Sequence, residues 1–118
     1  KGYANGVAAR GRQLFVAGQV GWRPDGVFES DDFAAQSEQA LRNVVAVLAA
    51  GDARPEHIVR MTWYVTSKRE YLAAGRAIGA AFRTVIGQYD IAMTAVEVTA
   101  LMEDRAKVEI EVTAVVPD

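Results

Sequence analysis

Hydrophobic and polar positions alternate strictly near the C-terminal end of the chain, which predicts two strands. In residues 107–115 the apolar set is Val108, Ile110, Val112 and Ala114, and the polar set is Lys107, Glu109, Glu111 and Thr113. In residues 91–101 they are Thr94, Val96, Val98, Ala100 and Met93, Ala95, Glu97, Thr99, Leu101. Each strand therefore has one face for a core. The other face mixes carboxylates with apolar side chains, which suits a ligand cleft or a subunit contact better than open water.

The preceding sequence predicts two more strands and two helices. Residues 13–17 are a short apolar strand, and residues 58–66 alternate in the same way as the C-terminal strands. Residues from about 31 to 50 have apolar positions at helical spacing, with Ser30 or Asp31 as the expected N-cap and Gly51 as the stop. A second amphipathic helix opens at Ser67 and continues to about Val85.

The element order is expected to be β-β-α-β-α-β-β, which counts one further strand before the first helix. Two amphipathic helices can cover one face of a single mixed sheet, which predicts a two-layer α+β fold and one domain over residues 1–118. The second sheet face stays uncovered. We expect it to carry Thr62, Tyr64, Met93, Ala95, Glu97 and Glu109. This mixture is unusual for a solvated face, so we expect the chain to oligomerise through it.

Composition and charge exclude several classes of protein. The net charge is −2 and the Lys and Arg residues form no run, so no nucleic-acid partner is expected. No apolar stretch approaches the ~20 residues of a membrane helix, so no membrane partner is expected. The absence of cysteine excludes disulfides, thiolate metal sites and cysteine nucleophiles, and it fits a cytoplasmic protein. We expect neither a metal nor another cofactor.

Five segments, in this order and spacing, resemble the Rid family, the YjgF-like reactive intermediate deaminases often labelled endoribonuclease L-PSP or translation inhibitor. They are residues 14–19, 36–48, 59–65, 96–101 and 108–111, so the resemblance covers essentially the whole chain. It implies a fold similar to trimeric chorismate mutase. In that arrangement three subunits pack their sheets into a central barrel, and small-molecule clefts lie between neighbouring subunits of the homotrimer.

The resemblance also implies site residues. Deaminating members open the last strand pair with a Pro-Ala-Arg-Ser/Thr motif, commonly with Cys two positions after the Arg, and the Arg binds the carboxylate of a 2-imino or 2-enamino acid. Here Ile91 replaces the Pro, Met93 the Arg and Ala95 the Cys, while Thr94 keeps the hydroxyl. Glu109 aligns with the glutamate that holds the attacking water.

Three further positions match the lining of the family's cleft: Tyr3 and Gly18 are kept, and Ala17 replaces a frequent Ser. A thioether offers no hydrogen-bond donor, so Met93 cannot bind a carboxylate as an Arg does. A substrate without a free carboxylate at that position is the natural inference. Arg76 and Arg83, on the second predicted helix, are the residues that could compensate.

Alternative interpretations stay open at this stage. Met93 and Ala95 could be core or trimer-contact residues, and Glu109 could belong to an ordinary solvated strand face. Two functions follow from the resemblance: hydrolysis of an imine or enamine C–N bond, or metabolite binding by a non-catalytic regulatory trimer. A ribonuclease or translation inhibitor has little chemical support, because the acidic chain has one histidine and no paired general acid and base.

Overall fold

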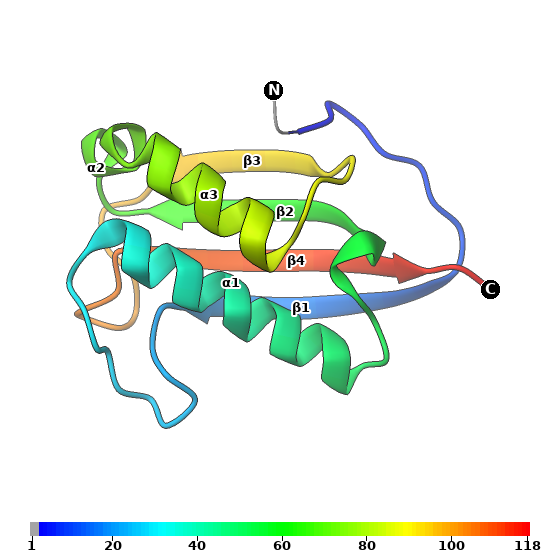
Figure 1. The fold of residues 1–118 in the computed structure, drawn as a ribbon, viewed down its shortest axis with the longest axis horizontal. Coiled ribbons are helices and arrows are strands. Elements are labelled where there is room, and N and C mark those ends of the chain that lie inside the picture. The colour runs from blue at the N-terminus through cyan, green and yellow to red at the C-terminus, as the bar shows by residue number, and fades with distance from the viewer. Residues whose placement is uncertain (1–2) are drawn as a thin grey trace.

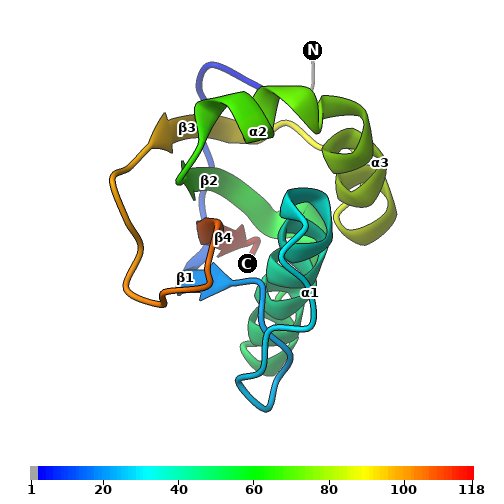
Figure 2. The same ribbon diagram turned by 90° about the vertical axis from the view of Figure 1, so that its left-hand side faces the viewer.

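A computed structural model describes residues 3–118 (Figure 1). The strands are β1 (Arg12–Val20), β2 (Ile58–Val65), β3 (Ala92–Glu97) and β4 (Val108–Val116). The helices are α1 (Phe33–Ala50), α2 (Lys68–Ala73), α3 (Gly75–Val85) and a short 3₁₀ turn, Pro55–His57. Seen along the sheet, the helices lie on one side of it (Figure 2). The predicted two-layer α+β fold is confirmed.

The four strands form one mixed sheet in the order β1-β4-β2-β3. β4 is antiparallel to both β1 and β2, whereas β3 runs parallel to β2. A parallel neighbour requires a crossover connection, and α2 and α3 provide it between β2 and β3. This crossover puts α3 over the β2–β3 half of the sheet and leaves the other half to α1.

The helix boundaries differ slightly from the prediction. The N-cap of α1 is Asp32, whose carboxylate accepts a 2.9 Å hydrogen bond from the Ala35 amide, rather than Ser30 or Asp31. Gly51 ends α1 as expected. The predicted second helix is divided at Ala74, which is both the C-cap of α2 and the N-cap of α3. α3 therefore has its own direction, independent of α2.

Two strand predictions are also corrected. Two strands were expected before α1, but the described residues contain only β1. Its pairing with β4 shifts between Val16 and Gln19, so a bulge carries β1 on to Val20, beyond the expected strand end at residue 17. β3 stops at Glu97, short of the predicted end at residue 101, because β2 ends at Val65. The Val98 amide still donates to the Val65 carbonyl, at 2.8 Å, before the chain leaves the sheet.

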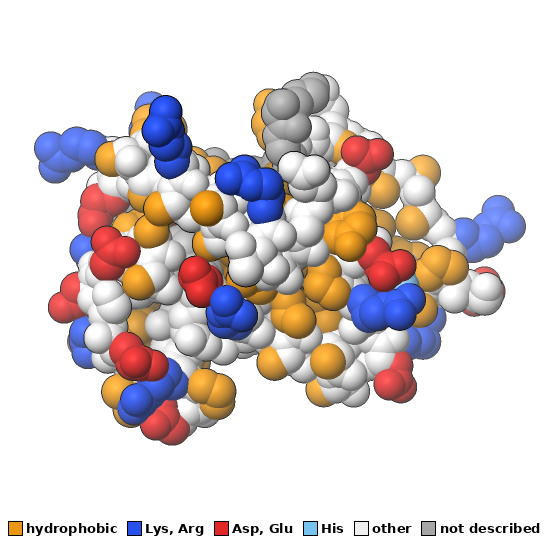
Figure 3. Space-filling model, in the orientation of Figure 1, with side chains coloured by type: hydrophobic (Ala, Val, Ile, Leu, Met, Phe, Trp, Pro, Cys, Tyr) orange, Lys and Arg blue, Asp and Glu red, His pale blue; other side chains and the backbone are white. Residues whose placement is uncertain are grey.

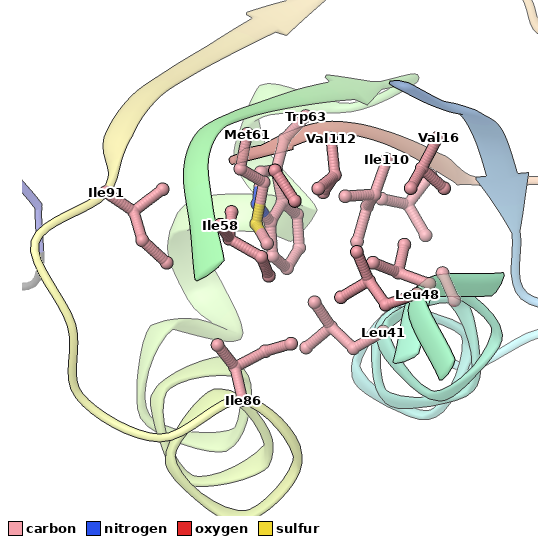
Figure 4. Packing of buried hydrophobic residues seen from close by; sticks show 14 of the residues in the cluster. Val16, Leu41, Leu48, Ile58, Met61, Trp63, Ile86, Ile91, Ile110 and Val112 are labelled. Carbon is pink, nitrogen blue, oxygen red and sulfur yellow. The ribbon is translucent and has the colours of Figure 1, made fainter. Parts of the chain in front are cut away.

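The main core lies between the sheet and the helices (Figure 4). The β4 residues predicted to face it, Val108, Ile110, Val112 and Ala114, are at most 3% exposed. Leu41 and Leu48 of α1 pack against them and are fully buried. A smaller cluster of Val20, Phe28 and Ala106 joins the loops before α1 and after β3. No helix within residues 3–118 is long and apolar enough to cross a membrane.

The predicted face of β3 is wrong. Met93 pairs with Met61 and Ala95 with Trp63, and both partners belong to the core. Neighbouring residues of paired strands point to the same side, so Met93, Ala95 and Glu97 lie on the helix side of the sheet. The open face carries the other β3 set, represented by Thr94 and Val96. Thr62, Tyr64 and Glu109 do lie on the open face, as expected.

Candidate functional site

A hollow of about 840 Å³ opens on the helix side of the sheet, between α3, β3 and the N-terminal segment. We call it the α3 pocket. It is lined by Tyr3, Trp63, Tyr71, Leu72, Gly75, Ile78, Gly79, Phe82, Arg83, Gly87, Gln88, Tyr89, Asp90 and Met93. Hydrophobic side chains come to the surface on this helix-bearing side of the molecule (Figure 3). The pocket therefore offers mostly apolar and aromatic surface to a ligand.

Aromatic side chains give the α3 pocket its shape. The Tyr71 ring packs edge-on against Trp63, with ring centroids 6.1 Å apart, and Trp63 is almost fully buried. Tyr71 also packs against Phe33 of α1, which fixes it from the other side. The indole Nε1 of Trp63 is buried without a hydrogen-bond partner among the described residues. We call Trp63, Tyr71, Phe82 and Tyr89 the aromatic wall.

Glu109 lies elsewhere, on the open face of the sheet beside Gly18. A Cβ atom added to Gly18 would fall 1.9 Å from Glu109 Oε2, so the carboxylate occupies the space that a side chain at position 18 would fill. Gly18 belongs to the β1 bulge, which explains this close approach. Ala17, the other residue at the bulge, is exposed. The bulge therefore positions the Glu109 carboxylate at a half-buried point of the open face.

Thr94 lines a second hollow, of about 480 Å³, on the open face. Phe15, Arg60, Thr62, Tyr64, Val96 and Glu111 are among its other lining residues. The Tyr64 hydroxyl donates a short hydrogen bond to the Glu111 carboxylate. This bond raises the pKa of Tyr64, and burial and the negative charges of Glu111 and Glu109 add to the effect, while Arg60 opposes it.

The predicted site residues thus fall in three places within one chain. Tyr3 and Met93 meet in the α3 pocket, Gly18 and Glu109 meet at the bulge, and Thr94 lies in the open-face hollow. Ala17 is next to the bulge, and Ala95 is exposed on β3. β2 separates Met93 from Glu109, and the two side chains lie on opposite faces of the sheet. A site that contains both residues requires a second copy of the chain.

Two features were missed by the sequence interpretation. One is the aromatic wall, which depends on the break between α2 and α3 and on the loop at residues 87–90. The other is the Tyr64–Glu111 contact. Alternation already placed both residues at polar positions of their strands, but only the β2–β4 register brings them together. Of the two arginines considered, Arg83 lines the α3 pocket and Arg76 does not.

Comparison with known proteins agrees with this fold. The endoribonuclease L-PSP family matches residues 1–116. The 2-iminobutanoate/2-iminopropanoate deaminase of Escherichia coli K12 is 34% identical over 113 residues, which cover 96% of this chain and 86% of the relative.

Solved structures point to the same family. The crystal structure of YyfB, a Rid-family protein of Yersinia pestis, superposes with a TM-score of 0.85 and 32% identity over 98% of this chain and 87% of that one. TdcF of Escherichia coli, solved with bound serine, gives a TM-score of 0.78 with 26% identity over 96% of this chain and 93% of that one. The family match and these similarities show that the chain belongs to the Rid family, also called the endoribonuclease L-PSP family.

Proposed function

We propose that the protein hydrolyses an imine or enamine C–N bond of a non-standard substrate, in clefts between the subunits of a homotrimer. The observation that carries this proposal is the Glu109 carboxylate lying against the bare backbone of Gly18. A half-buried carboxylate in the space left by a glycine at the bulge suits a group that must position a water molecule. Membership of a family that includes imine deaminases supports the same reaction class.

Glu109 has a simple role in this chemistry. Its carboxylate accepts a proton from a water molecule as the water oxygen attacks the C=N carbon. The tetrahedral carbinolamine then collapses when its nitrogen takes up a proton and leaves as ammonia or an amine, and a carbonyl compound remains. Water is the only co-reactant, and the hydrolysis needs neither an oxidant nor a reductant.

Assembly explains why the residues are apart in one chain. Met93 and Glu109 cannot contact one ligand within a single copy, because β2 and the sheet plane separate them. The open face keeps Phe15 70% exposed and Val96 40% exposed, next to carboxylates, which is unfavourable for a solvated surface. Packing of these faces between three copies would cover them and bring the Met93 end of one chain toward the Glu109 end of another.

The α3 pocket indicates what kind of substrate is excluded. Met93 offers no donor to a carboxylate, and aromatic rings line the pocket beside it. A charge-assisted hydrogen bond contributes about 1.5–3 kcal/mol, so its loss weakens carboxylate binding at this position by about tenfold or more. We therefore place an apolar part of the substrate against Met93, and we expect ordinary 2-imino acids to be poor substrates.

Ammonia release from imines generated in situ by an amine oxidase tests the proposal. The native chain should accelerate the release from at least one imine that carries no carboxylate on the C=N carbon, and Glu109→Gln should abolish this acceleration. Turnover that survives Glu109→Gln would contradict the role given to Glu109. Thermal stabilisation by such compounds without any turnover would favour the alternative function, a metabolite-binding regulatory trimer.

A further inference from the structure

The α3 pocket contains one positive side chain, Arg83, on the last turn of α3. Its guanidinium forms no ion pair within residues 3–118. Asp90 is the only carboxylate in the lining and is likewise unpaired within that range. A guanidinium carries five N–H donors in a planar fork that matches the two oxygens of a carboxylate. Arg83 is therefore an anion-binding group that has no ion-pair partner within residues 3–118, at a pocket whose lining includes five aromatic side chains.

The pocket side of α3 is built to leave room in front of this group. Gly75, Gly79 and Arg83 follow each other at intervals of four residues, so they lie along one side of the helix. A Cβ added to Gly79 would lie 3.4 Å from Arg83 Nη1, so the guanidinium extends back along the helix over Gly79. A Cβ added to Gly75 would meet no atom within 4 Å. Open space therefore continues beyond the guanidinium.

The size and lining of the α3 pocket define the rest of the ligand. About 840 Å³ lies within the range of pockets that enclose drug-sized molecules and exceeds the needs of a three-carbon acid. The aromatic wall suits an aromatic or branched body. Asp90 adds a negative charge to the same lining, so repulsion of the ligand grows with each further anionic group that it carries.

We propose that Arg83 binds the carboxylate of a monoanionic organic acid whose aromatic or branched body lies on the aromatic wall. This inference deepens the proposed function and rests on it for the chemistry, because it names the substrate class of the same protein. The substrate would carry its carboxylate at the Arg83 end of the pocket, away from the C=N carbon. The absence of a hydrogen-bond donor at Met93 then does not weaken the binding of this substrate.

An ordinary structural role for Arg83 makes a different prediction. A positive side chain in the last turn interacts favourably with the helix dipole. In that case Arg83→Gln would lower stability slightly and would leave ligand binding unchanged. Binding of a matched pair of probes separates the two roles.

The test compares 3-phenylpropionate with its uncharged analogue 3-phenylpropanamide, each titrated into the purified full chain by calorimetry. The native chain should bind the acid at least about tenfold more tightly than the amide. Arg83→Gln should remove this preference, and Arg83→Lys should retain part of it. Arg76→Gln, a neutralised arginine on the same helix but outside the pocket lining, should leave the preference intact.

Equal binding of the two probes, no binding of the acid, or a preference that survives Arg83→Gln would overturn the inference. The same titration with Glu109→Gln keeps it distinct from the proposed function, because this variant should lose turnover and still prefer the acid. An acid preference without turnover in the native chain would refute the hydrolase and leave the anion site standing. Turnover without an acid preference would refute the anion site at Arg83 and leave the hydrolase standing.

Discussion

The two faces of the sheet differ in burial and in the role that we assign to each. On the helix side, Ile110 and its neighbours on β4 are at most 3% exposed and belong to one cluster with side chains of α1 and α3. On the open side, Phe15 is 70% exposed and lines the same hollow as the Tyr64–Glu111 pair, and the Glu109 side chain is half-buried further along β4. The helix side holds the single chain together. The open side carries polar groups and an exposed ring, and this is where we place assembly and the hydrolytic carboxylate.

The largest effect should come from the covered face. Ile110→Ala removes a fully buried side chain from the centre of the core and should lower the free energy of unfolding by about 2–5 kcal/mol. Thr113→Ala, on the open face of the same strand, should change it by no more than about 0.5 kcal/mol. Urea denaturation followed by tryptophan fluorescence measures both variants. Similar losses in the two variants would remove the distinction between the faces.

A glycine on the open face should control activity without controlling stability. In Gly18→Ala the new Cβ would fall 1.9 Å from Glu109 Oε2, and the carboxylate must move because it is the freer partner. We expect turnover to fall by about 100-fold, since an error of about 1 Å in a catalytic group has this effect. Gly6→Ala, whose added Cβ meets no atom within 4 Å, serves as the control.

Ammonia release and thermal melting should be measured on both glycine variants. An active Gly18→Ala protein would show that Glu109 needs no fixed position. A large fall in its melting temperature would instead show that the bulge is required for folding.

Assembly provides the next comparison. Phe15→Ser removes an aromatic ring from the open face and should weaken formation of the proposed trimer by about 1.5–3 kcal/mol per buried ring. Leu72→Ser, a change to an apolar side chain that is 63% exposed on the helix side, should leave the trimer intact. Sedimentation velocity across a dilution series measures both. Dissociation by the Leu72 variant alone would move the interface to the other side of the molecule.

The smallest effect should be a pH dependence centred on Tyr64. Its raised pKa, caused first by the hydrogen bond to Glu111, means that folding favours the protonated phenol. The resulting stabilisation is complete below the unfolded pKa of about 10 and disappears as the pH rises through the folded pKa. Tyrosinate absorbance of the native chain minus that of Tyr64→Phe should show this late titration. Glu111→Gln should shift it to lower pH, and an unchanged titration would contradict the assigned cause.

Much of the fold was predictable because its signals are local. The alternation over residues 108–114 has a strong contrast between Val or Ile and Glu or Thr, so the buried face could be assigned before any pairing was known. The end of α1 at Gly51 was predictable because glycine is a common residue at helix C-termini, which is a local signal. The predicted N-cap of α1 lies at least one residue before the observed one, Asp32. Ser30, Asp31 and Asp32 can all act as N-caps, so the sequence alone does not choose among them.

The face of β3 could not be predicted for a physical reason. Its two alternating sets, one with Met93 and Ala95 and the other with Thr94 and Val96, hardly differ in polarity. The parallel register with β2 decides between them by placing Met93 beside Met61. The α3 pocket could not be predicted, since it depends on the helix break at Ala74 and on the path of the chain from α3 back to β3.

Ammonia release from freshly generated 2-iminopropionate, by the native chain and by Met93→Arg, separates the roles of positions 93 and 109. We infer that Glu109 is competent for hydrolysis and that position 93 does not bind a carboxylate. We expect slow release by the native chain, an increase of about tenfold or more in Met93→Arg, and loss of that gain in Met93→Arg combined with Glu109→Gln. Efficient release by the native chain, or a Met93→Arg protein that folds and stays inert, would show that this inference is wrong.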